Sequence, residues 1–118
     1  ARIAAKAVQE MHEAYQTAPA QLRATIGPGI SLKNFEVGDE VYQAFADAGF
    51  EMSSIACRYE KWHIDLPLCN AQQLMAAGVP ATQIHLSGVC TYDACDRFFS
   101  ARRLGIRSGR IFSGLMLL

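Results

Sequence analysis

The sequence predicts a mixed α/β fold of the α+β class, built in layers. Segments with the helical period of apolar residues alternate along the chain with short strand candidates. Long loops separate these segments, which favours a layered arrangement over a regular doubly wound sheet. The chain has 118 residues, of which 51% are hydrophobic, so it can bury the core of one domain without a metal or a disulfide to hold it.

The first part of the chain predicts a helix, a strand and a bend. Apolar residues recur at intervals of three and four within residues 2–17, as on one side of a helix, and Pro19 ends that helix. Residues 22–26 predict a short strand. Gly27 and Gly29 follow it, and we expect them to form a tight bend with backbone angles that other residues resist.

The middle of the chain predicts a second helix, a strand and a third helix. We expect the second helix to end at Gly49. Its predicted core face consists of Val41, Ala44, Phe45 and Ala48. Residues 61–66 alternate as a strand does, and the third helix should run from residue 67 or 68 to residue 77.

The last third predicts two strands around a long loop. Residues 82–89 are a strand candidate, and residues 90–109 show little periodicity, so we expect an ordered loop there. Residues 110–118 return to a strand pattern and end the chain.

Charge and cysteine content narrow the functional classes. Eleven basic residues balance eleven acidic ones, which argues against a general nucleic-acid-binding or membrane-surface protein. The chain has no apolar run long enough to span a membrane and no signal segment at its start. Its cysteines lack the paired spacing of zinc sites, so we expect reduced thiols in the cytoplasm, with a Cys90–Cys95 disulfide as the alternative. The four cysteines are Cys57, Cys69, Cys90 and Cys95.

Arginines concentrate near the C-terminus and predict an anion site. Five of the eight arginines lie within residues 97–110. Guanidinium groups bind phosphate or carboxylate through two parallel hydrogen bonds. We predict that the adjacent Arg102 and Arg103 bind an anion, with Ser100 beside them. The alternative is that these arginines pair with acidic residues or face solvent.

Two weaker patterns also carry chemistry. A turn around Gly27 and Gly29 can shape the wall of a pocket and let a ligand approach the backbone, although most such turns only redirect the chain. Cys90 could be a nucleophile with His85 or His63 as its base. Cysteine is also often a small buried apolar residue, and no third orienting group is evident, although Asp65 could orient an imidazole at His63.

Four stretches of the chain resemble successive sequence motifs of the YfiH-type laccase-domain family. Together they cover residues from about 22 to 118. They are "IGPGI" with "FEVGDEV", "WHIDLPLCNAQQLMAAGV", "IHLSGVCTYDACDRFFSARR" and "SGRIFSGLMLL". The family has been described as multicopper polyphenol oxidase, peptidoglycan-editing factor and purine nucleoside phosphorylase. The resemblance implies a layered α/β/β/α sandwich made of two related halves.

The resemblance also implies an enzymatic activity and the absence of the family's N-terminal half from this chain. Members of the family carry out zinc-dependent phosphorolysis of adenosine, inosine and methylthioadenosine, and they deaminate adenosine. Purine nucleoside and phosphate are therefore the expected ligands. The family's zinc ligands lie in its N-terminal half, so the resemblance implies that residues 1–118 form a single, N-terminally truncated laccase-like domain. We expect this chain to hold no metal itself and to pair with the missing N-terminal half.

Other functions remain open at this point. The catalytic residues are unassigned, and the chain could be a non-catalytic structural half of a larger protein. A cysteine hydrolase that uses Cys90 is a further alternative. A copper-dependent polyphenol oxidase ranks last, because the sequence has no copper-type cluster of histidine and cysteine.

Overall fold

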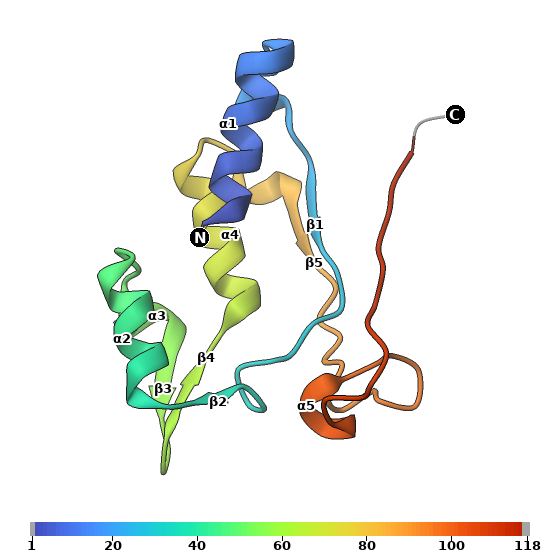
Figure 1. Cartoon of the computed structure of the whole chain (residues 1–118). Helices are drawn as coiled ribbons and strands as arrows, with labels where there is room; N and C mark the ends of the chain where they lie inside the picture. Colours follow the sequence, from blue (N-terminus) through green and yellow to red (C-terminus); the bar gives the residue numbers. More distant parts are fainter. Residues whose placement is uncertain (1, 117–118) are drawn as a thin grey trace.

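The computed structural model describes residues 2–116, and one packed group within it consists of two helices and a parallel strand pair (Figure 1). The helices α1 and α4 pack against each other, and α4 also contacts β1. β1 pairs in parallel with β5, so that Thr25 lies opposite His85. The elements of this group are α1 (Ile3–Tyr15), β1 (Ala24–Ile26), α4 (Leu66–Ala76) and β5 (Ile84–Leu86).

A second group consists of a three-stranded antiparallel sheet with two short helices. The strand order is β2–β4–β3, and β4 therefore has a partner on each side. Its elements are β2 (Glu36–Val37), α2 (Asp39–Asp47), α3 (Met52–Ile55), β3 (Ala56–Arg58) and β4 (Trp62–Ile64). A chain segment, residues 27–35, connects β1 of the first group to β2 of the second (Figure 1).

The main core lies between this antiparallel sheet and α4. Its buried members are Val37, Ile55, Ile64 and Cys69. Aromatic and aliphatic side chains from α2 and from the segment before β2 close over them, including Phe35, Val41 and Phe45. Removal of this apolar surface from water is the main stabilising term for such a small sheet.

The predicted fold class is confirmed: the chain is a mixed α/β protein with small parallel and antiparallel sheets. The predicted core face of α2 is correct for Val41 and Phe45 but wrong for Ala44 and Ala48, which are exposed. Tyr42 lies on the inner side instead, and its ring stacks on Trp62 with centroids 4.1 Å apart. An aromatic ring buries more apolar surface than an alanine methyl group, which favours this orientation of the helix.

Two predictions near the C-terminus are wrong. The expected loop 90–109 contains a short helix, α5 (Ala101–Leu104), whose first turn is capped by Ser100. Residues 110–116 form no strand, and residues 117–118 lie outside the described part. A strand needs a neighbouring strand for its hydrogen bonds. Phe112 is 94% exposed and Leu115 fully exposed, so this segment has the composition of a strand and no partner within residues 2–116.

The N-terminal helix is confirmed, but it is only half covered. Val8 is buried, whereas Ile3 and Tyr15 are exposed. No helix within the described residues is both long and apolar enough to cross a membrane.

Candidate functional site

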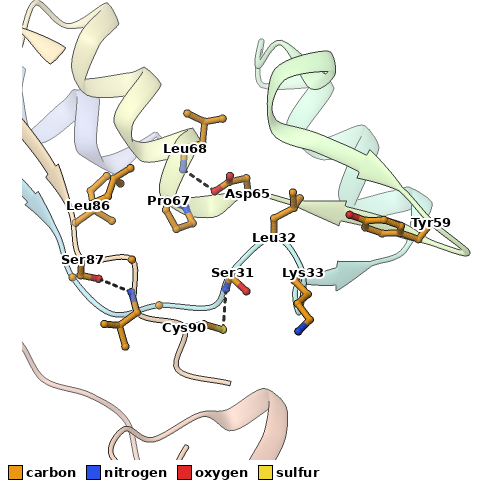
Figure 2. A pocket seen from close by; sticks show the side chains of 15 residues that line it. Ser31, Leu32, Lys33, Tyr59, Asp65, Pro67, Leu68, Leu86, Ser87 and Cys90 are labelled. Carbon is orange, nitrogen blue, oxygen red and sulfur yellow. Dashed lines mark hydrogen bonds between the residues drawn. The ribbon is translucent and has the colours of Figure 1, made fainter. Parts of the chain in front are cut away.

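A cavity of about 420 Å³ lies where the two parallel strands end. The segments that follow β1 and β5 form one side of it, and the start of α4 forms another (Figure 2). The carboxyl ends of parallel strands are where open α/β sheets commonly bind ligands. The walls are mostly apolar, and they include Ile26, Leu32, Pro67, Leu68, Leu86 and Val89.

Backbone hydrogen bonds fix the wall that contains the two glycines predicted to shape a pocket. The amide of Gly29 donates to the carbonyl oxygen of Val89 at 3.2 Å, and that of Thr91 donates to Gly29 at 3.0 Å. Gly27 and Gly29 both line the cavity. The expectation of unusual backbone angles is wrong, because neither glycine has a positive φ and an added Cβ would meet nothing within 4 Å. Their lack of a side chain leaves the cavity wall open.

Cys90 is the thiol on this wall. Its sulfur accepts hydrogen bonds from the Ser31 amide and from Nδ2 of Asn34, each at 3.3 Å. The same side-chain amide of Asn34 also donates a hydrogen bond to Oδ1 of Asp93 at 3.0 Å, and this second bond orients the Asn34 side chain. Burial acts to raise the pKa of Cys90, but hydrogen bonds from Ser31, Asp93 and Asn34 outweigh it and lower the pKa to about 7. A substantial fraction of this thiol is therefore thiolate at neutral pH.

The histidines considered as bases for Cys90 lie elsewhere. His85 is exposed on β5, and His63 on β4 directs Nδ1 at the Leu32 carbonyl oxygen, 2.9 Å away. Neither hydrogen-bonds to Cys90 within residues 2–116, where the partners of its sulfur are Ser31 and Asn34. Asp65, expected as a partner for an imidazole, accepts a hydrogen bond from the Leu68 amide at 3.0 Å instead.

Asp65 is the N-cap of α4 and also lines the cavity. We predict that Asp65→Ala lowers the free energy of unfolding by about 1 kcal/mol, because the Leu68 amide loses its acceptor. Asp65→Asn should retain most of the stability, since asparagine caps helices equally well. Urea unfolding of the two variants measures this difference. Equal stability of the alanine and asparagine variants would contradict the capping role.

The predicted anion-binding residues lie outside the cavity, around α5. Arg102 donates from Nη1 to the Glu36 carbonyl oxygen at 2.8 Å, and its guanidinium lies 5.1 Å from the ring centre of Phe35. Arg103 donates to the Tyr92 carbonyl oxygen at 3.1 Å and lies over the Tyr92 ring. Ser100 is buried and accepts from the Arg103 amide. The structure thus brings these three residues together and keeps them apart from Gly27 and Gly29.

Several polar groups of the site could not be found in the sequence. Asn34 and Ser31 contact Cys90 from positions 56 and 59 residues earlier in the chain. Lys33 and Tyr59 also line the cavity. No motif connects these residues, and only the pairing of β1 with β5 brings the segment after each strand to the same place.

Within the described residues, no group of three or more histidine, cysteine, aspartate or glutamate side chains could hold a metal ion. The residues present therefore do not fit the metal that the resemblance implies. The four cysteines are unpaired thiols, and burial followed by the charge of Asp65 raises the pKa of Cys69 to about 11.

Comparison with known proteins identifies the family. The family model described as multi-copper polyphenol oxidoreductase laccase matches residues 1–118, which is the whole chain. The chain belongs to this laccase family. Among solved structures, the laccase-family chain resembles the Bacillus licheniformis hypothetical protein YfiH, with a TM-score of 0.78 and 32% identity over 86% of this chain and 39% of that one. It resembles YlmD from Geobacillus stearothermophilus to a similar extent, with a TM-score of 0.77 and 32% identity over the same shares of the two chains.

Curated relatives of this laccase-family chain carry enzyme names. A purine nucleoside phosphorylase of Bacteroides thetaiotaomicron is 52% identical over 110 residues, which are 91% of this chain and 41% of the relative. An adenosine deaminase from an unknown prokaryotic organism is 46% identical over 117 residues, which are 97% of this chain and 44% of the relative. The chain therefore spans less than half the length of these relatives.

Proposed function

We propose that this chain is part of a zinc-dependent purine nucleoside phosphorylase, a transferase that acts on adenosine, inosine and methylthioadenosine and also deaminates adenosine. The observation that carries the proposal is the 52% identity to a purine nucleoside phosphorylase over 91% of the chain. Phosphorolysis breaks the bond between C1′ of the ribose and N9 of the purine and forms a bond from C1′ to a phosphate oxygen. The purine leaves with a proton.

The cavity supports this proposal by its size and lining. Nucleoside-sized ligands bind in clefts of about 300–1,000 Å³ with mainly apolar walls and a few polar groups. The cavity here, of about 420 Å³, has apolar walls and presents Ser31, Asp65 and Cys90. We propose that the nucleoside occupies it, with Gly27 and Gly29 as open wall. We propose that Arg102, Arg103 and Ser100 bind phosphate outside this cavity, around α5, from where it moves to the ribose to react.

We further propose that residues outside these 118 hold the zinc, because the described part offers no cluster of ligands. A Lewis-acidic metal ion would stabilise negative charge on an oxygen of the reacting groups. The free thiols are in keeping with a reducing cytoplasm.

The test uses the full-length gene product, assayed on inosine with and without phosphate. We expect hypoxanthine and ribose 1-phosphate only when phosphate is present. Removal of metal by a chelator should abolish the product, and zinc should restore it. Cys90→Ser is the matched variant: phosphate-dependent product that survives this change argues against a cysteine hydrolase, whereas turnover without phosphate that is lost in the variant favours it.

A structural role is the second candidate, and one observation favours it. Apolar side chains in and after α5 are exposed, among them Ile106 at 93% and Phe112 at 94%. Such a surface suits packing against another part of a larger protein. If the full-length product converts neither inosine nor adenosine, this structural reading replaces the enzymatic one.

A further inference from the structure

His63 connects the antiparallel sheet to the cavity wall. It lies in the middle of β4, and its side chain is 12% exposed. Nδ1 is 2.9 Å from the carbonyl oxygen of Leu32. Leu32 lines the cavity (Figure 2). A carbonyl oxygen can only accept a hydrogen bond, so Nδ1 carries the proton and donates it. The ring thereby fixes one point of the segment 31–34.

That segment supplies the donors that hold Cys90. The Ser31 amide precedes Leu32 by one residue, Asn34 follows it by two, and both donate to the Cys90 sulfur at 3.3 Å. The contact from His63 therefore lies between the two donors along the chain. The amides of Asn34 and Phe35 donate to the Ser31 carbonyl oxygen at 3.1 and 2.9 Å, so these residues form one hydrogen-bonded turn. A displacement of Leu32 would therefore carry Ser31 and Asn34 with it, away from the sulfur.

The other groups around His63 do not replace this contact. Glu36 and Cys57 lie opposite it on the two neighbouring strands. An Oε2 atom of Glu36 is 3.8 Å from Nε2, and the Glu36 carboxylate also meets Lys61 at 3.7 Å. The Tyr59 ring meets the imidazole edge to face, with centroids 4.9 Å apart. These groups surround the ring, and within the described residues Nδ1 is the ring atom that hydrogen-bonds to the cavity segment.

We propose that His63 is a positioning residue: by donating to Leu32 it holds residues 31–34 so that the N–H groups of Ser31 and Asn34 stay on Cys90 at the cavity wall. This role goes beyond the proposed function, because it is a property of the folded chain and requires no turnover. Hydrogen bonds to a thiolate favour its charged form, so the ionisation of Cys90 reports whether the segment is in place.

The experiment measures the rate of Cys90 alkylation by iodoacetamide across a pH series in the full-length protein, with the modified residue identified by peptide mass mapping. In the wild type, the rate should be half-maximal near pH 7. His63→Leu removes the donor, so the midpoint should rise toward the ordinary thiol value of 9.0. His63→Asn keeps an N–H donor and should restore a midpoint near that of the wild type.

The controls separate positioning from general disturbance. Tyr59 lines the same cavity, but within the described residues its hydroxyl makes no hydrogen bond to Leu32 or Cys90. Tyr59→Phe keeps the ring beside His63, so it should leave the midpoint unchanged. Cys95, mapped in the same digest, should react alike in all variants. If His63→Leu does not fold, His63→Phe takes its place, because it keeps a ring against Tyr59 without an N–H.

A midpoint near 7 in a folded variant without the donor would overturn the proposal, as would failure of His63→Asn to restore it. These results are independent of enzymatic activity. A wild-type protein without phosphorolysis would count against the proposed function and leave the thiol measurement intact.

Discussion

Replacing Ile64 by alanine is expected to lower the free energy of unfolding by about 2–5 kcal/mol, the largest effect we predict for a single substitution in this chain. Ile64 is fully buried at the end of β4, and it belongs to the core cluster with Val37 and Ile55. Two effects add to this loss of stability. Fewer side-chain carbons are removed from water on folding, and an empty cavity remains because the strands on both sides prevent the site from collapsing.

Urea unfolding of the full-length protein measures this loss, provided that the slope of free energy against urea is unchanged. Ile64→Val is the matched variant, because it removes one methyl group at the same position and should cost about 0.5–1.5 kcal/mol. A loss below about 0.5 kcal/mol in Ile64→Ala would show that this residue is not at the centre of the core.

Replacing Arg103 by alanine is expected to raise the KM for phosphate about 30-fold, which corresponds to a charge-assisted contact of about 2 kcal/mol. Arg103 is exposed, and within the described residues its guanidinium makes one hydrogen bond, from Nη1 to the Tyr92 carbonyl oxygen. Arginine has five N–H donors, so several remain for an anion. The melting temperature should stay close to that of the wild type, because an exposed contact of this kind adds little stability.

The control for this prediction is another arginine that lies over an aromatic ring. Arg58 is exposed and stacks over Trp62 at 5.3 Å, away from α5. Arg58→Ala should leave the KM for phosphate unchanged. If Arg103→Ala lowers the melting temperature and leaves phosphate kinetics unaltered, the arginine fastens α5 to the segment at Tyr92 and does not bind phosphate.

The sequence predicted the helices well because their signals are local. The helix over residues 2–17 was found as α1, and the third helix begins one residue before the expected position because Asp65 caps it. Strands were harder to predict. β2 and β3 have two and three residues and become strands only by pairing with β4. Residues 110–116 have the pattern of a strand but no partner within the described residues.

The candidate site, too, was predictable where its residues lie close together in the sequence and not where they are distant. The sequence indicated Cys90 and the two glycines, and the structure places all three on one cavity wall. The sequence also indicated Arg102, Arg103 and Ser100 as one group. These residues do lie together on and beside α5, outside that cavity. Their role as an anion site remains a prediction. Asn34 was not recognised, since its contact with Cys90 spans 56 residues.

The helices, the mixed α/β class and the family could be predicted from the sequence, because they depend on local periodicity and on motifs in a fixed order. The three-dimensional structure was needed to show which residues share the cavity, which carbonyl His63 contacts and which hydrogen bonds lower the pKa of Cys90. Each of those depends on the parallel pairing of β1 with β5 or on the register of β4 between its neighbours. The pairings of β1 with β5 and of β2 with β4 join residues far apart in the chain, and a local pattern does not show which distant strands will meet.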